Sequence, residues 1–166
     1  MITVMRPMGT LIGAATLVIL AGCATTERTM PEPSPAAKPI TFGANGVAVK
    51  KPVDVRKLAG APEDFQQFIA GRLDEAVSTR DPEFPECVPT VNVNVYDPTG
   101  FASGSRTDCG GYAIIWAKKG GAWQEVWGGQ DLAACSELEA LHVPPSVVPD
   151  QKCYAKGAQK AERYTG

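Results

Sequence analysis

The sequence predicts an α+β fold in which one amphipathic helix packs on an antiparallel sheet of three or four strands. The first observation is a single stretch of helical periodicity, residues 62–79. The second is a set of three stretches with strand character that follow it: residues 88–96, 110–118 and 122–127. A helix with one apolar stripe needs a partner surface, and the strands that come next provide one.

The predicted helix has apolar residues at the i, i+3 and i+4 spacing of one buried face. These residues are Phe65, Phe68, Ile69, Leu73, Ala76 and Val77. Pro62 and the two acidic residues after it favour a helix start, because proline is tolerated there and carboxylates stabilise the positive end of the helix dipole. The helix is expected to end before Pro82.

The first strand alternates, with Val91, Val93 and Val95 expected on one face and two asparagines on the other. Residues 97–100 carry the side chains that a type I turn prefers, so residues 101–107 are expected to pair back as a fourth strand. The pair Gly120-Gly121 then indicates a turn between the last two strands.

A shorter second helix is predicted to begin at Asp131 and to end before Pro144. Its apolar side is formed by Leu132, Cys135, Leu138 and Leu141. The lead-in to the first helix, residues 40–62, mixes apolar residues with glycines and prolines, and its order is left open. Val53 and Val55 in this segment fit a short edge strand.

The first residues have the features of an export signal. Arg6 precedes an apolar stretch, residues 8–20, that is shorter than the roughly 20 residues of a membrane-spanning helix. The stretch ends in Leu20-Ala21-Gly22-Cys23, which resembles the lipobox of bacterial lipoproteins. The resemblance implies a signal peptide at residues 1–22, cleavage after Gly22 and acyl chains on Cys23.

Four prolines lie in residues 23–39, and this composition is typical of an extended tether. The expected organisation is therefore a signal peptide, a lipidated tether, a partly ordered lead-in over residues 40–62 and a single α+β domain over residues 63–166. The protein is expected to be exported and held at the outer face of the cell membrane, where two or three acyl chains give stable anchoring.

Four cysteines remain besides Cys23, and an even number in an exported chain predicts two disulfides. If residues 97–100 form a tight turn, Cys87 comes close to Cys109, and Cys135 then pairs with Cys153. If residues 98–108 form a wide loop instead, Cys109 pairs with Cys135 and Cys87 with Cys153. The first pairing is favoured.

No motif of a known catalytic or cofactor-binding type is present, so we expect a non-enzymatic protein with no catalytic residues, no cofactor and no metal. The single histidine, His142, is expected to interact with the end of the second helix. A net charge of −2 predicts neither nucleic-acid binding nor a polybasic membrane patch. An envelope hydrolase would require a polar pocket around Asp97, Asp108 or His142.

The strongest candidates for ligand contact are aromatic. With a two-residue turn at Gly120-Gly121, one sheet face carries Tyr112, Trp116, Trp123, Glu125 and Trp127. With a three-residue turn, the last strand presents its tryptophans on the other face. A face of this kind either packs under the first helix or forms a groove for a glycan or another planar ligand.

The later half of the chain resembles small secreted or lipid-anchored proteins of actinobacteria. The resemblance is carried by Cys109-Gly110-Gly111-Tyr112, by Trp123 and by the run from Gln130 to Cys153. Such proteins have no assigned biochemistry, so it implies fold and location only. Together these features predict a lipid-anchored envelope protein with a non-catalytic binding or scaffolding domain, whose partner is an envelope protein or a glycan.

Overall fold

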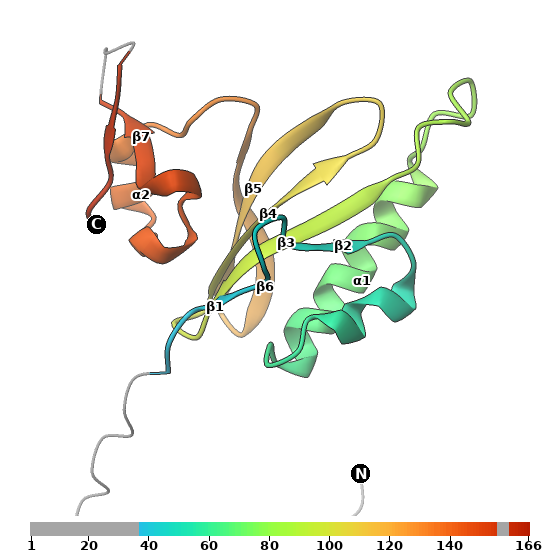
Figure 1. The fold of residues 1–166 in the computed structure, drawn as a ribbon, viewed down its shortest axis with the longest axis horizontal. Helices are drawn as coiled ribbons and strands as arrows, with labels where there is room; N and C mark the ends of the chain where they lie inside the picture. The colour runs from blue at the N-terminus through green and yellow to red at the C-terminus, as the bar shows by residue number, and fades with distance from the viewer. Residues whose placement is uncertain (1–36, 156–159) are drawn as a thin grey trace, which may run out of the picture. The chain divides into compact units, whose positions relative to one another are not determined.

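The computed structural model describes residues 37–155 and 160–166, which belong to one compact unit over residues 35–166. The predicted signal peptide, Cys23 and most of the predicted tether therefore lie outside the described residues. In the described part, one helix covers one face of a sheet, and a smaller C-terminal part packs on the other face (Figure 1). No helix of the described residues has both the length and the apolar character that crossing a bilayer requires.

The large sheet has six strands, and its pairing is antiparallel throughout. The α+β class is confirmed, but the expected number of strands, three or four, is too low. In chain order the elements are β1 (Ile40–Thr41), β2 (Val47–Val49), the 3-10 helix η1 (Pro52–Lys57), α1 (Glu63–Ser78), β3 (Thr90–Asp97), β4 (Phe101–Thr107), β5 (Gly111–Lys119), β6 (Ala122–Gly129), α2 (Cys135–Ala140), the 3-10 helices η2 (Pro145–Val147) and η3 (Pro149–Gln151), β7 (Lys152–Tyr154) and β8 (Ala161–Arg163). The last two strands form a separate small sheet.

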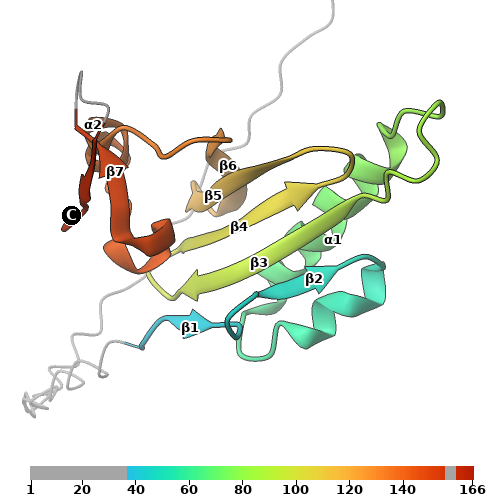
Figure 2. The ribbon, with the colours of Figure 1, turned by 45° about the horizontal axis from the view of Figure 1, so that its top comes forward.

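The two additional strands come from the lead-in segment. β1 and β2 both pair with β3, so they share one edge of the sheet, and the order then continues through β4 and β5 to β6 (Figure 2). Val53 and Val55 do not form the expected edge strand, because they lie in η1. Pro52 favours a helical start, and the Asp54 carboxylate accepts the backbone N–H groups of Lys50 and Lys51.

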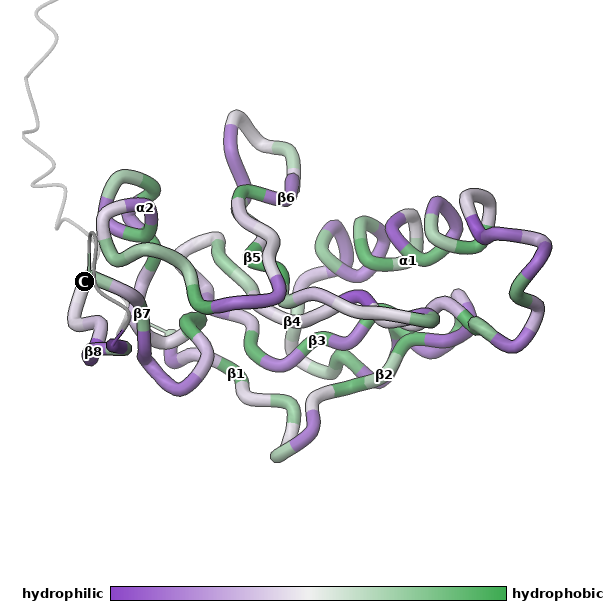
Figure 3. The backbone as a smooth tube through the Cα atoms, turned by 90° about the horizontal axis from the view of Figure 1, so that it is seen from above, coloured by the Kyte–Doolittle hydropathy of each residue, from purple (hydrophilic) through white to green (hydrophobic). Residues whose placement is uncertain are grey.

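α1 packs its apolar stripe on the sheet as expected, and its ring and aliphatic side chains surround one tryptophan. Phe65, Ile69 and Leu73 are buried in the same cluster as Trp116, which is 0% exposed. The ring centroids of Phe65 and Trp116 lie 6.3 Å apart in an edge-on arrangement, which aromatic pairs favour. Hydrophobic and hydrophilic residues both occur along α1, as an amphipathic helix requires (Figure 3).

A β-bulge in β3 changes which side chains face α1. The register passes from Val93 opposite Gly104 to Val95 opposite Ser103, so Asn94 is the extra residue. A bulge of this kind reverses the alternation beyond it. Val95 therefore packs with the C-terminal part instead of sharing a face with Val93, and Tyr96 takes the position facing α1.

The C-terminal part has its own core, formed around Leu138, Val143, Val147, Cys153 and Tyr164. α2 begins at Cys135, later than the expected Asp131. The preceding residues are extended instead, because the backbone N–H of Tyr154 donates to the Ala133 carbonyl at 2.9 Å and residue 134 bridges to Tyr154. A helix through these residues would lose that contact with β7.

Both cysteine pairs lie at disulfide distance with the favoured connectivity, Cys87 with Cys109 and Cys135 with Cys153. Their Cα atoms are 4.8 and 5.0 Å apart, within the usual range for a disulfide. The first pair follows from the tight turn at residues 97–100, where the Gly100 N–H donates to the Asp97 carbonyl at 3.0 Å. The second joins α2 to β7.

The close packing of the sheet under α1 predicts the effect of two glycine substitutions. A Cβ atom at Gly104 would overlap the Asn92 carbonyl and would lie 2.9 Å from Cη2 of Trp116, whereas a Cβ at Gly71, on the exposed side of α1, would meet nothing within 4 Å. We expect Gly104→Ala to lower the free energy of unfolding by about 3 kcal/mol. Gly71→Ala should raise it by about 1 kcal/mol, because alanine is the better helix former.

Urea titration of the purified protein measures both changes. Equal and small effects at the two positions would contradict the close packing described around Gly104.

Candidate functional site

The predicted aromatic face is divided between the two sides of the sheet. The turn between β5 and β6 has two residues, Gly120 and Gly121, both at positive φ, and residue 119 pairs with residue 122. Trp116 and Glu125 are then opposite each other as expected. Beyond them Val126 forms a bulge, so that Trp127 pairs with Ile115 and faces the C-terminal part. The expectation that all three tryptophans share one face is therefore wrong at Trp127.

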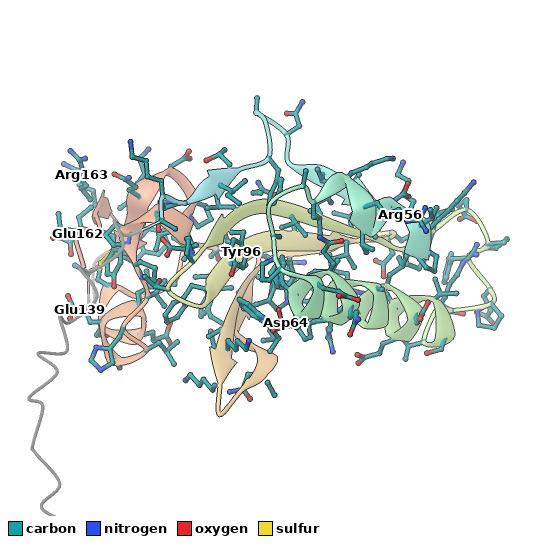
Figure 4. All side chains as sticks on the ribbon, turned by 90° about the horizontal axis from the view of Figure 1, so that it is seen from below. Arg56, Asp64, Tyr96, Glu139, Glu162 and Arg163 are labelled. Atoms are coloured by element: carbon teal, nitrogen blue, oxygen red, sulfur yellow. A yellow bond between two sulfur atoms is a disulfide. The ribbon has the colours of Figure 1, made fainter. Side chains whose placement is uncertain are left out.

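On the α1 side of the sheet, Trp123 links the β5–β6 hairpin to the first turn of α1 through a hydrogen bond. Its indole Nε1 donates to a carboxylate oxygen of Asp64 at 3.1 Å, and the same oxygen accepts from Lys118 Nζ at 2.6 Å. The hydrogen bond from Lys118 is the main reason that the pKa of Asp64 lies below its ordinary value. Figure 4 shows Asp64 on α1 beside this hairpin. The contact leaves the Trp123 ring against Phe65, 4.7 Å between centroids, and not as an open platform.

The other two candidates on this side, Tyr112 and Glu125, lie near the helix as well. Glu125 is 3.7 Å from Arg72 of α1, measured between Oε2 and Nη2. Burial raises the pKa of Glu125 above its ordinary value, and Arg72 opposes that shift only in part. Tyr112 is half-buried beside the same cluster. These side chains therefore lie beside the α1 core and do not form an open ligand-binding face.

On the opposite side, Trp127 lines a cleft between the sheet and the C-terminal part. The cleft has a volume of about 250 Å³ and is lined mostly by apolar side chains. Its lining residues are Ala113, Ile115, Trp127, Gln130, Asp131, Leu132, Ala133, Leu138, Val148, Pro149, Lys152 and Tyr154. Two aromatic rings, Trp127 and Tyr154, come from opposite walls, and one carboxylate and one ammonium group, from Asp131 and Lys152, lie among the lining residues. This is the composition of a small-ligand site.

Sequence reasoning missed this cleft for two reasons. The side of the sheet that Trp127 faces depends on the bulge at Val126, which has no clear sequence signal. The other wall combines residues 130–138, whose path depends on the pairing with β7, with residues after 144, whose mixed polarity gave no periodic pattern. The paired apolar residues Val147 and Val148 are the one available sign that this segment packs against something.

The residues considered for hydrolysis have structural contacts. The buried Asp97 carboxylate accepts hydrogen bonds from Ser146 Oγ, from Thr99 Oγ1 at 2.7 Å and from the Thr99 N–H at 2.9 Å. Asp108 lies 3.8 Å from Arg106 in a separate hollow beside Cys109. His142 is exposed and follows Leu141, the C-cap of α2, with a φ of 55°. None of these three side chains lines the cleft.

Two groups of potential metal ligands occur in the described part of the chain, and each depends on cysteines. They are Glu86 with Cys87 and Cys109, and Glu162 with Cys135 and Cys153. Because the cysteines of each group lie at disulfide distance, neither group offers a thiolate to a metal ion.

Comparison with known proteins assigns no family. No family model matches the sequence, and neither a curated protein nor a solved structure matches it significantly.

The hydrogen bonds to Asp97 predict a pH dependence of stability. Burial alone would raise the pKa of Asp97, but the bonds from Ser146 and Thr99 outweigh it and hold the pKa below the ordinary 3.8. A carboxylate with a lowered pKa stabilises the folded state above the ordinary pKa, and this contribution is lost as the pH falls through the lower folded-state pKa. Asp97→Asn should therefore reduce the urea midpoint at neutral pH.

The difference in urea midpoint between the wild type and Asp97→Asn is expected to shrink as the pH falls below 3.8. The exposed Asp74→Asn serves as the control, with no pH-dependent difference of comparable size. A constant difference from neutral pH to strongly acidic pH would show that the Asp97 charge has no part in it.

Proposed function

We propose that this chain is a lipid-anchored protein of the cell envelope whose described part is a non-catalytic binding module. The anchoring rests on Leu20-Ala21-Gly22-Cys23 and the basic and apolar residues before it. The binding role rests on one observation, the cleft lined by Trp127 and Tyr154 between the sheet and the C-terminal part. The non-catalytic assignment is supported by Asp97, whose carboxylate is already occupied by three internal hydrogen bonds.

The cleft supports a planar apolar group as the ligand, in preference to a sugar on an open platform. Glycan platforms use aromatic faces that are free to stack, whereas Trp116 is buried and the Trp123 ring lies against Phe65. Trp127 and Tyr154 instead provide rings on two walls of one cleft of about 250 Å³. A single ring system or one large side chain of a partner protein fits such a volume.

Cys23→Ala tests the anchor. The substitution removes the thiol that acylation requires, so the protein should leave the membrane fraction after a high-salt wash, whereas Thr26→Ala should remain in it. The measurement is the distribution of protein between washed membranes and supernatant, together with the mass of the intact protein. Retention of Cys23→Ala in washed membranes would refute the anchoring proposal.

Binding of 1-anilinonaphthalene-8-sulfonate, a dye with aromatic rings and one sulfonate group, tests the cleft. Ala113→Leu places extra carbon atoms in the cleft and Trp127→Ala removes one wall, so each should weaken dye binding at least about tenfold, the effect of one lost aromatic contact. Trp123→Phe, on the opposite side of the sheet, should leave the dissociation constant unchanged.

Dye fluorescence is titrated on each variant after its far- and near-ultraviolet circular dichroism has been shown to match the wild type. Unchanged affinity in both Ala113→Leu and Trp127→Ala would remove the cleft as the ligand site. Binding of soluble oligosaccharides that quenches tryptophan emission equally in all variants would instead favour the glycan alternative.

A further inference from the structure

A short basic segment, residues 50–57, stands out against the charge of the whole chain. It reads Lys50-Lys51-Pro52-Val53-Asp54-Val55-Arg56-Lys57, with four basic residues and one acidic residue, whereas the chain as a whole has a net charge of −2. All four basic residues are exposed. We call this segment, which consists of η1 and the two lysines before it, the basic loop.

Asp54 holds the basic loop in a fixed conformation. One carboxylate oxygen accepts the backbone N–H groups of Lys50 and Lys51 at 3.1 and 3.0 Å, and the other contacts Lys57 Nζ at 2.8 Å. These contacts, led by the hydrogen bond from Lys57, lower the pKa of Asp54 to about 2. Lys50, Lys51 and Arg56 make no ion pair with any other residue that the structure describes, so their charges are available to an external anion.

An apolar side chain lies among these charges. Val53 is 55% exposed and is one of four large apolar side chains with substantial exposure in residues 37–155 and 160–166. Exposed cations around an exposed apolar side chain are typical of surfaces that contact the headgroup region of a membrane, where the cations meet phosphates and the apolar group meets acyl chains. A soluble polyanion would gain nothing from Val53.

The basic loop lies on the edge of the sheet where the described chain begins. β1 and β2 both pair with the outer side of β3, and η1 follows β2 directly (Figure 2). A tether that arrives at residue 37 therefore reaches the domain on this edge, near the other end of β3, because Ile40 pairs with Tyr96 whereas Val49, just before the basic loop, pairs with Val91. In Figure 4, Arg56 of the basic loop lies at the opposite end from Glu139 and Arg163 of the C-terminal part.

We propose that the basic loop docks the domain onto a bilayer that contains anionic lipids, through Lys50, Lys51 and Arg56 at the headgroup phosphates and Val53 below them. The inference rests on the proposed anchoring, which keeps the domain close to the membrane, but the two make separate predictions. Each basic residue near an anionic surface contributes about 1 kcal/mol, or about fivefold in the docking equilibrium. Three such residues bias it by about 100-fold.

The test uses the full lipidated chain reconstituted into vesicles. A nitrobenzoxadiazole side chain in place of Val53 reports the local environment, and the same side chain in place of Glu139 on α2 is the matched control. With phosphatidylglycerol in the vesicles, emission at position 53 should rise and shift to shorter wavelength, and added salt should reverse the change. Emission at position 139, and emission from either position in vesicles of phosphatidylcholine alone, should stay constant.

A triple variant, Lys50→Gln, Lys51→Gln and Arg56→Gln, should lower the ratio of docked to undocked molecules about 100-fold, because three surface charges are lost. It keeps the pair of Lys57 and Asp54 that orders the loop. The matched variant, Lys119→Gln, Lys160→Gln and Arg163→Gln, loses the same charge at exposed positions elsewhere and should leave the position-53 signal intact.

The outcomes separate the two proposals. Protein that floats with vesicles after a salt wash, but shows no lipid-dependent change at position 53, overturns docking and leaves the anchor standing. Release of the protein from the vesicles by salt would contradict the lipid anchor. The emission at position 53, measured before the salt is added, would still test docking. An equal shift at position 53 with inorganic polyphosphate and no vesicles would identify a soluble polyanion as the ligand and overturn the membrane proposal.

Discussion

The burial of the Trp116 ring between α1 and the sheet is the packing constraint on which the rest of this structure depends. A side chain at position 104 would overlap the Asn92 carbonyl and crowd the edge of the indole, so β4 needs glycine beside the ring. Phe65 and Phe68 of α1 lie 6.3 and 6.4 Å from it between centroids, which fixes the position of the helix on the sheet. Two ion pairs, Asp64 with Lys118 and Arg72 with Glu125, then join α1 to the β5–β6 hairpin. Both depend on this position of the helix.

Two β-bulges determine which face of the sheet Val95 and Trp127 occupy. The bulge at Asn94 sends Val95 to the C-terminal side, and the bulge at Val126 does the same for Trp127. Without them both residues would join the α1 core. With them, the second side gains enough apolar surface to hold the C-terminal part, and the fit between Trp127 and that part leaves the cleft.

The sequence predicted those elements whose signal is local. The stripe of α1 and the turns at residues 97–100 and 120–121 follow from local spacing, and the favoured cysteine pairing depended on the first of these turns. β1 and β2 are too short to show periodicity and depend on pairing with β3. The cleft could not be predicted, because it depends on a bulge and on the tertiary packing of residues 130–138 and 148–154 against the sheet. The basic loop was also not predicted, because the net charge of the whole chain, −2, includes acidic residues elsewhere that offset its four cations.

The strand order gives the proposed arrangement a direction. The basic loop follows β2 at one edge, while Ala113, Ile115 and Trp127, which form the sheet wall of the cleft, belong to β5 and β6 at the other edge. Four strand spacings separate β2 from β6, or about 19 Å. A domain docked through the basic loop would therefore hold the β5–β6 edge away from the lipid, where a partner outside the membrane can approach the cleft. In the proposed arrangement, anchor, loop and cleft would follow one another from the bilayer outward, because the sheet separates the edge with the basic loop from the edge with the cleft.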